Sequence, residues 1–382
     1  MILFLMVFLS FYGGMHLYVW LRLRSLVAPG AGCTAWMTMM TCAPLLVRLL
    51  ERYGWDRAAL WIAWPSYIWM GGIFLFSVVL LTLDLARLVL LATGVGRRKQ
   101  SRFPAPLSAA TCCAAALALA CISSAYALYE AQQIRTERIT ITSSRLPAGT
   151  PPRTIVQLSD VHLGLLFREQ RLERVLQAVR SARPDILVST GDLVDGRLAR
   201  EDAMQHRSSL AGMLAAVPAP LGRYAVIGNH EHYVGIEQSL DYTRSAGFTV
   251  LQDQAVSLPN GITILGVNDQ GRVRIKDGSA SPGEQSLLAQ DHRGFRLLLK
   301  HRPLVPAASD GRFDLQLSGH THKGQLLPFY PLTWLEYPFR SGTTRTARGA
   351  WIHVSRGSGT WGPPMRFLAP PEVTVITIRP EA

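Results

Sequence analysis

The sequence predicts two parts of different fold class: an all-α membrane region of about four transmembrane helices, followed by an α/β domain. Two observations predict this division. The chain up to about Tyr129 is mostly apolar, whereas the remainder has the composition of an ordinary soluble protein. In that remainder, short apolar strands alternate with segments whose apolar residues have helical spacing, which is the pattern of α/β folds. We therefore expect a membrane region over residues 1–130, a linker with an edge strand over residues 131–152, and the α/β domain over residues 153–382.

The apolar part contains four candidate membrane spans, since each crossing of a bilayer needs roughly 20 apolar residues. They cover residues 2–21, 34–50, 66–92 and 106–129. The second is the weakest, because it is short, contains Pro44 and carries Arg48 near its end. The tryptophans at 55, 61 and 64 are typical of a bilayer interface and are expected between the second and third spans. A signal peptide is the alternative for the first segment, but it lacks a basic start and a clear cleavage site.

The orientation of the spans follows from Lys and Arg in the short loops. The first loop contains Arg22 and Arg24, and the third contains basic residues at 97, 98, 99 and 102. The second loop contains basic residues at 48, 52 and 57. The excess in loops one and three favours the cytoplasm for them, so we expect everything after Tyr129 to lie outside.

Two ionisable residues, Asp84 and Arg87, lie inside the third span. Such residues are by default candidates for a functional site, here transport. The alternative is that they neutralise each other, because residues three apart share one face of a helix. Arg87 can also extend its charged end towards the interface.

Charge and cysteine content exclude several classes of protein. The formal net charge is +13, but the chain has no long Lys/Arg run and no nucleic-acid motif, so we expect no nucleic-acid partner. The excess reflects either membrane orientation with attraction for phosphate-bearing or anionic-lipid substrates, or a generally basic surface. All five cysteines, at 33, 42, 112, 113 and 121, lie in the apolar part. The α/β domain therefore has neither a disulfide framework nor a cysteine-type zinc site.

Five predicted strands of the α/β domain each lead directly into a cluster of Gly, Asp, Asn or His. They are expected at residues 154–158, 186–190, 224–227, 295–299 and 313–317, with helices at 169–181, 200–216 and 237–245 and a last strand at 372–378. In open α/β sheets, ligands bind beyond the carboxyl ends of the strands. We therefore expect the polar clusters to meet on one rim.

The residues in these clusters are typical metal ligands. The inventory is Asp160, His162, Asp192, Asn229, His301, His320 and His322. Asp160 and His162 should point the same way, as residues i and i+2 do in an extended segment. The set is too large for one cation and suits two, bridged by a shared carboxylate. Because thiolates are absent, it favours manganese, iron or zinc in an octahedral-type site. Each motif alone could be a turn or a helix cap, so the prediction depends on their joint occurrence.

The same motifs resemble those of the calcineurin-like metallophosphoesterase superfamily, and most of all its membrane-anchored bacterial branch. The matching residues are Asp160-x-His162, Gly191-Asp192-x-x-Asp195, Gly228-Asn229-His230-Glu231, His301 and Gly319-His320-x-His322, within about residues 150–380. Gly324-Gln325 and the segment 356–366 also look typical of that branch. Lys323 is a departure, because relatives often have Gly there, and it is either a phosphate contact or an exposed side chain.

The resemblance implies an α-β-β-α sandwich and a hydrolase that acts on phosphoester bonds with two divalent metal ions. By this resemblance, Asp160, His162 and His322 hold the first ion, whereas Asn229, His301 and His320 hold the second, and Asp192 bridges both. We expect His230 to be the catalytic residue that orients the phosphate and protonates the leaving alkoxide. Asp195 is expected to brace a loop or a neighbouring histidine.

We therefore expect a membrane-anchored phosphoesterase that hydrolyses a phosphodiester or pyrophosphate bond through a hydroxide bridging two metal ions, manganese first, with iron or zinc as alternatives. Its location is the bacterial inner (cell) membrane, with the catalytic domain on the periplasmic or extracellular side. A lipid-linked or envelope substrate would suit this attachment. Aromatic residues in the late loops then form either a lipid-facing lip or loop cores; they are Trp334, Tyr337, Phe339, Trp361 and Phe367. The alternative is a non-enzymatic membrane sensor that binds a ligand with a phosphoesterase-like domain. The oligomeric state stays open.

Overall fold

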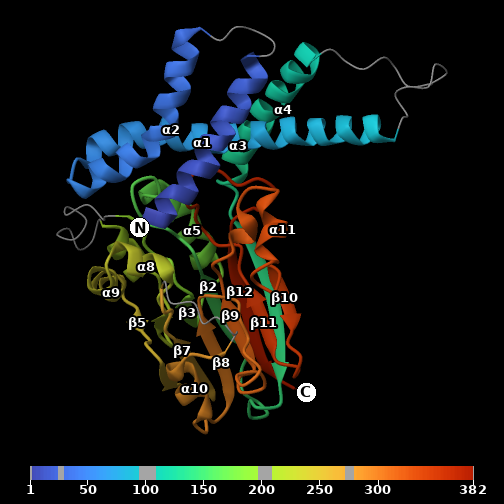
Figure 1. Cartoon of the computed structure of the whole chain (residues 1–382). Helices are drawn as coiled ribbons and strands as arrows, with labels where there is room; N and C mark the ends of the chain where they lie inside the picture. The colour runs from blue at the N-terminus through green and yellow to red at the C-terminus, as the bar shows by residue number, and fades with distance from the viewer. Residues whose placement is uncertain (1, 25–29, 94–108, 197–208, 272–278, 382) are drawn as a thin grey trace. The chain divides into compact units, whose positions relative to one another are not determined.

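The computed structural model describes residues 2–24, 30–93, 109–196, 209–271 and 279–381 (Figure 1). The chain forms two compact units. The helical unit comprises Met1–Leu128 with Gly362–Met365, and the α/β unit comprises Tyr129–Trp361 with Arg366–Ala382. The basic residues expected in the third loop, at 97, 98, 99 and 102, lie outside the described residues. So do residues 200–208 of the helix expected at 200–216.

The helical unit consists of α1 (Ile2–Arg24), α2 (Ala31–Arg52), α3 (Asp56–Ala92) and α4 (Ala109–Glu130). Over the described residues, three helices are long and apolar enough to cross a membrane: Ala31–Arg52, Asp56–Leu90 and Ala110–Glu130. The segment that looked weakest in the sequence is therefore among them, with Pro44 inside α2. Side chains of residues 2–5 are not described, so α1 as a fourth span stays a prediction. Trp61 and Trp64 are not in a loop between spans, because α3 begins at Asp56.

The ionisable residues of α3 do not form the pair expected from their spacing. Asp84 forms an ion pair with Arg22 of α1 instead. It also accepts a hydrogen bond from the Tyr18 hydroxyl, with an oxygen–oxygen distance of 2.7 Å. Arg87 is exposed. The partner comes from another helix that packs against α3, so the spacing of residues along α3 could not reveal it.

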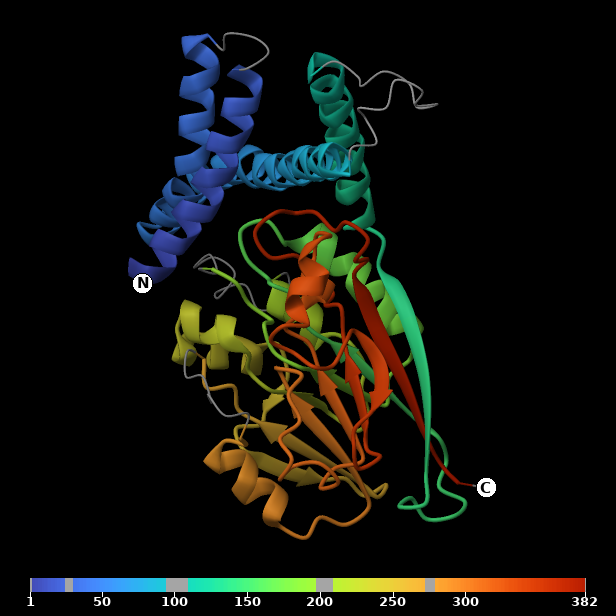
Figure 2. The ribbon, with the colours of Figure 1, turned by 45° about the vertical axis from the view of Figure 1, so that its right-hand side comes forward.

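The α/β unit contains two six-stranded sheets (Figure 2). The first has the order β1 (Arg135–Ser143), β12 (Glu372–Pro380), β2 (Arg153–Leu158), β3 (Ile186–Ser189), β4 (Arg223–Ala225), β5 (Thr249–Val250). The second has the order β10 (Gly342–Arg345), β11 (Trp351–Val354), β9 (Leu315–Ser318), β8 (Phe295–Lys300), β7 (Ile262–Val267), β6 (Gln254–Ser257). Strands β2 to β5 are parallel, as are β7, β8, β9 and β11. The edge strand expected within residues 131–152 is β1, which lies at one edge of the first sheet.

Short helices connect or follow these strands. They are α5 (Glu169–Ser181), α7 (Leu210–Ala215), α8 (Asn229–Val234), α9 (Ile236–Ser245), α10 (Pro282–Ala289), the 3₁₀ turn η2 (His322–Gly324) and α11 (Phe329–Thr333). The strong helical spacing of Leu172, Leu176 and their neighbours predicted α5 with the bounds that the structure has.

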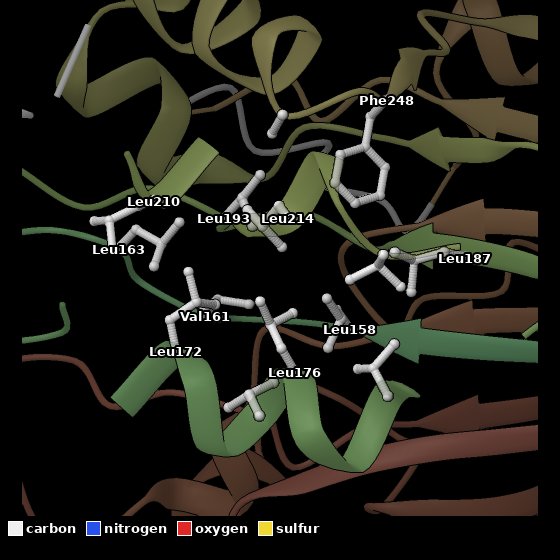
Figure 3. Close-up of a cluster of buried hydrophobic side chains, with 14 of the residues drawn as sticks. Leu158, Val161, Leu163, Leu172, Leu176, Leu187, Leu193, Leu210, Leu214 and Phe248 are labelled. Carbon is white, nitrogen blue, oxygen red and sulfur yellow. The ribbon is translucent and has the colours of Figure 1, made fainter. Parts of the chain in front are cut away.

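Alternation of side chains along the strands builds the layers. Ile155 belongs to the apolar core between the two sheets, whereas the next residue, Val156, belongs to the core beneath α5 and α7. Figure 3 shows Leu172 and Leu176 of α5 facing Leu158 and Leu187 of the first sheet. A third core joins the second sheet to α10. The expected α-β-β-α sandwich is therefore confirmed, because successive strand residues face opposite sides of each sheet.

Candidate metal centre

The first group of candidate ligands follows β2 and β9. His162 Nε2 lies 3.0 Å from His322 Nε2, and His322 Nε2 lies 3.5 Å from Asp160 Oδ1. These three side chains are buried, and their ligand atoms all lie within 4.8 Å of one another. One carboxylate and two imidazoles thus converge on one point, although His322 is 160 residues from His162 in the sequence.

The second group follows β3, β4, β8 and β9. Asp192 Oδ2 lies 3.2 Å from His301 Nε2. The same His301 nitrogen lies 3.2 Å from Asn229 Oδ1 and 3.0 Å from His320 Nδ1. Asp192 Oδ2 also lies 4.0 Å from His162 Nε2 of the first group. A single carboxylate oxygen therefore faces both groups, and all seven residues expected as ligands lie in one centre.

The donor set fits divalent cations. Buried carboxylate, amide and imidazole atoms face one another here at 3.0–4.0 Å. Burial lowers the pKa of His162 to about 3, helped by the charge of His230. Burial also lowers the pKa of His320 and His322 well below the usual range. Neutral imidazoles are the form that binds metal, so these rings are ready to act as ligands.

His301 and Asp192 form a tightly coupled buried pair. Burial opposes charge on His301, but the Asp192 carboxylate outweighs it and raises the pKa of the imidazole to about 10. Burial likewise disfavours the Asp192 anion, yet His301 and His230 hold the pKa of that carboxyl well below its usual value. His301 Nδ1 lies 2.8 Å from the Thr190 carbonyl, which directs Nε2 towards the other ligands. Binding of a cation at Nε2 therefore has to displace a proton.

Backbone strain is concentrated at the candidate ligands. Five of them have positive φ: Asp160 (50°), His162 (52°), Asp192 (51°), His320 (70°) and His322 (49°). Asp160 and His162 do reach the same group of ligands, as expected, but the expectation that they do so as part of an extended strand is wrong. β2 ends at Leu158, and tertiary contacts hold both residues in the left-handed region. Such conformations cost about 1–3 kcal/mol each and are common at functional sites.

The glycines of the motifs allow this close approach of loops. A Cβ atom at Gly319 would lie 1.9 Å from Ser159 Oγ, and one at Gly228 would lie 2.2 Å from Asp192 Oδ1. Neither position has room for a side chain. The glycines are thus required because the ligand loops from the two sheets pack directly on one another.

His230 lies beside the centre with its own acidic partner. Its Nδ1 lies 3.1 Å from Asp195 Oδ1, so Asp195 braces this ring. The His230 backbone N–H donates to Asp192 Oδ1 at 2.9 Å. Burial lowers the pKa of His230, but Asp192 and Asp195 outweigh it and raise the pKa to about 9. The ring is therefore protonated at neutral pH and can donate a proton.

The family model for calcineurin-like phosphoesterases matches residues 153–324. An uncharacterized metallophosphoesterase of Aquifex aeolicus is 42% identical over 263 residues, which cover 68% of this chain and 98% of that relative. Another from Bacillus subtilis is 34% identical over 271 residues, covering 66% of this chain and 89% of the relative.

The chain belongs to the calcineurin-like metallophosphoesterase family. It is a hydrolase that acts on phosphoester bonds. A protein of Danio rerio named as a transmembrane protein with a metallophosphoesterase domain is 30% identical over 276 residues, covering 69% of this chain and 62% of that protein. Together with the three apolar helices, this similarity indicates that the metallophosphoesterase is associated with a membrane.

Glu231 is a residue of the metallophosphoesterase whose role sequence reasoning missed. Its buried carboxylate accepts hydrogen bonds from the backbone N–H groups of Gly228, Leu193 and Asp192, at 2.8, 2.7 and 3.1 Å. It thereby ties the loop that carries Asn229 to the loop that carries Asp192. In the sequence, only the position of Glu231 directly after His230 in the motif indicated that it has a role at the site.

Arg366 was also missed, although the segment 356–366 was noted as typical of the branch. Its guanidinium is fully buried and donates to the carbonyls of Arg356 and His322 at 2.7 and 3.0 Å. In the same segment, the Gly359 N–H donates to the Asp160 carbonyl at 2.9 Å. The late loop is therefore bonded to both ligand loops of the first group.

The backbone conformation at position 323 explains why relatives of the metallophosphoesterase often have Gly where this chain has Lys. Lys323 has φ 52° and ψ 35°, which is a left-handed conformation that glycine adopts without strain. Its ammonium lies over the Tyr330 ring, 5.5 Å from the ring centre.

The five aromatic residues of the late loops were expected to form either a lipid-facing lip or the cores of the loops, and they differ in exposure. Trp334 and Trp361 are exposed, Tyr337 is buried, and Phe339 and Phe367 are partly buried.

Proposed function

We propose that this metallophosphoesterase is a membrane-anchored enzyme that hydrolyses a phosphodiester or pyrophosphate bond with two divalent metal ions. The proposed metal is manganese, with iron or zinc as alternatives. The observation that carries the proposal is the position of Asp192 Oδ2. It lies 3.2 Å from His301 in one ligand group and 4.0 Å from His162 in the other. A carboxylate shared between two ligand groups is the arrangement that two-metal sites use.

In this proposal the two ligand groups have separate roles. Asp160, His162 and His322 hold one ion and Asn229, His301 and His320 hold the other, with Asp192 in common. When bound, two cations polarise the phosphoryl group and make a nucleophile available at neutral pH. The buried, mutually bonded loops keep the ligands in place before substrate arrives.

His230 supplies the proton. With Nδ1 held by Asp195, the other ring nitrogen is left to face a substrate. The Asp195 carboxylate raises the pKa of the ring, which favours the protonated form that can bind a phosphoryl oxygen and then protonate the departing alkoxide. His230 is therefore our candidate catalytic residue.

The proposed substrate is lipid-linked or another envelope phosphoester, and the proposed location is the bacterial inner membrane with the α/β unit on the periplasmic side. The three apolar helices and Arg24, in the last turn of α1, support this assignment. We likewise propose domain boundaries at 1–130, 131–152 and 153–382.

The test uses the full chain in detergent, stripped of metal with a chelator. Manganese, iron(II) or zinc is titrated back while hydrolysis of ethyl p-nitrophenyl phosphate is followed. We expect turnover to saturate at two ions per chain. His320→Ala should lower both the bound metal and the turnover, because it removes a ligand of the second group.

His292→Ala is the matched control. His292 lies outside the centre, with Nε2 2.8 Å from the Leu287 carbonyl, so its removal should leave metal content and turnover unchanged. Saturation at one ion, with full turnover, would contradict the two-metal proposal. Two ions bound without turnover on any phosphoester would favour the ligand-binding sensor.

A further inference from the structure

Exposed apolar side chains of the α/β unit are concentrated at one place. In the described part of this unit, the exposed large hydrophobic residues are Tyr129, Tyr233, Leu327, Leu332, Trp334, Leu335, Trp361 and Leu368. Six of them, from 327 to 368, come from two late segments, and we call these six the apolar rim. Leu335 is 85% exposed and Leu332 is 55% exposed. Leucines this exposed contribute little to the stability of the unit, so their presence calls for another explanation.

The two segments of the rim are held together by hydrogen bonds. The Leu327 N–H donates to the Phe367 carbonyl at 3.1 Å, and the Phe367 N–H donates to the Gln325 carbonyl at 2.9 Å. The Gln325 amide also bonds both backbone groups of Trp361, at 2.8 and 2.9 Å. The rim is therefore one ordered surface, although its residues are far apart in the sequence.

This surface borders the metal centre. Gln325 follows η2, which begins at the candidate ligand His322. The Trp361 ring lies 5.5 Å from the His230 ring, measured between ring centres. A molecule that lies on the rim is thus within reach of the proton donor.

The chemistry of the rim is that of a lipid interface. α11 has no buried residue, so none of its side chains serves the core. Arg340 lies over the Trp334 ring at 3.9 Å, and Lys323 lies over the Tyr330 ring at 5.5 Å. Aromatic rings next to basic groups and exposed leucines are typical of the boundary between headgroups and acyl chains.

The chain itself brings the α/β unit to a bilayer. The last candidate span ends at Glu130, and β1 begins at Arg135, so only residues 131–134 separate them. Four residues reach about 14 Å at most. Glu130 and Ala369 both belong to the α/β unit, and the Ala369 N–H donates to Glu130 Oε2 at 3.1 Å. Leu368 of the rim is therefore next to the residue at which the span ends.

We propose that the apolar rim docks into the lipid interface, so that the metal centre receives the phosphoester of an amphiphilic substrate directly from the bilayer. The second half of this inference rests on the proposed function. The first half, docking of the rim, does not require catalysis.

The test of the second half uses the full chain in vesicles of phosphatidylethanolamine and phosphatidylglycerol, with two esters that share one leaving group. Hexadecyl p-nitrophenyl phosphate partitions into the vesicle, whereas ethyl p-nitrophenyl phosphate stays in water. We expect Leu335→Glu to lower kcat/KM about tenfold for the hexadecyl ester only, since a charge in the interface opposes docking. Ala255→Glu adds the same charge at an exposed position of β6 and should change neither rate.

Equal loss on both esters, or no loss on either, would overturn delivery of the substrate from the bilayer. If the wild type hydrolyses neither ester, the proposed function fails instead.

Docking of the rim has its own readout, fluorescence quenching by lipids brominated on the acyl chains. We expect Trp334→Phe to lower the quenched share of tryptophan emission, because it removes an emitter that lies in the lipid. Trp351→Phe, in β11, is the control and should not lower that share. Equal changes in the two variants would overturn docking, whatever the enzyme does.

Discussion

The helical unit and the metal centre place acidic side chains beside different partners. In the helical unit, Asp84 pairs with Arg22, and Glu51 pairs with Arg48 at 3.1 Å. Each acid has a strong base as its neighbour, which neutralises it. In the metal centre, Asp160 and Asp192 face imidazoles. Paired charges of the first kind stabilise a fold, whereas convergent ligands of the second kind need a cation to complete them. The comparison shows that the position of an acid in the fold decides whether it is structural or functional.

The largest expected effect comes from the same substitution made in each unit. Asp192→Asn should lower turnover of ethyl p-nitrophenyl phosphate by about 10³-fold or more and remove bound metal, because it takes away the shared ligand. Asp84→Asn should change neither quantity. Kinetics and elemental analysis of the full chain in detergent measure both. An Asp192→Asn protein that kept two ions and full turnover would show that Asp192 is not a shared metal ligand and that its role does not differ from that of Asp84.

The second effect separates the proton donor from the ligands. His230→Ala should lower kcat about 10²-fold for an ester with an alcohol leaving group and leave the metal content unchanged. The loss should be smaller with p-nitrophenolate, which departs without needing a proton. Kinetics with both leaving groups test this role. Equal losses with the two leaving groups, or loss of metal, would place His230 among the ligands instead.

A third, smaller effect concerns the clamp between ligand loops. Glu231→Gln replaces a buried carboxylate that accepts four backbone hydrogen bonds. We expect a loss of about 2 kcal/mol, hence a thermal midpoint lower by roughly 4–8 °C, because one amide oxygen cannot satisfy all four donors. Thermal unfolding in detergent measures it. The exposed Glu237→Gln, in α9, is the control and should leave the midpoint unchanged. A Glu231→Gln midpoint within 1 °C of wild type would show that the clamp is dispensable.

The fourth effect lies in the helical unit. Asp84→Asn should destabilise the full chain by about 1 kcal/mol, because Arg22 and the Tyr18 hydroxyl lose a charged partner. A double-mutant cycle with Arg22→Gln should show coupling between the two positions, measured from thermal midpoints in detergent. Additive losses would mean that the ion pair does not stabilise the fold. Arg87 would then be the next candidate partner of Asp84.

The smallest effect is a dependence on pH. Burial disfavours charge on Glu372, but hydrogen bonding to His353 and the charge of Arg356 outweigh it and lower the pKa of the carboxyl below its usual value. A carboxyl with a lowered pKa stabilises the fold above its unfolded pKa, and the contribution disappears as the pH falls through the folded value. Glu372→Gln should therefore lower the thermal midpoint at pH 7 and have less effect at acidic pH. An equal shift at both pH values would contradict this account.

Local patterns were sufficient for most elements and for all seven candidate ligands. α5 was predicted with its observed bounds, because its apolar residues repeat strictly every three or four positions. The candidate ligands were recognisable because each follows a predicted strand, most of them within a short motif that contains glycine. β10, β11 and α10 were not predicted, although Trp351–Val354 alternates weakly. Short segments of this kind acquire their conformation from neighbouring strands, so their own sequence carries little signal.

The sequence by itself determined the division into an apolar and an α/β part, the strand-end motifs and the chemistry of their residues. These are local properties, because hydropathy and side-chain type act within a few residues. Only the tertiary structure decided that Asp84 pairs with Arg22, that Glu231 and Arg366 fasten the ligand loops, and that Leu332 and Leu335 form an exposed rim with Leu368. Each of these facts depends on contacts between segments that are distant in the chain, and on which surfaces the packed layers leave uncovered.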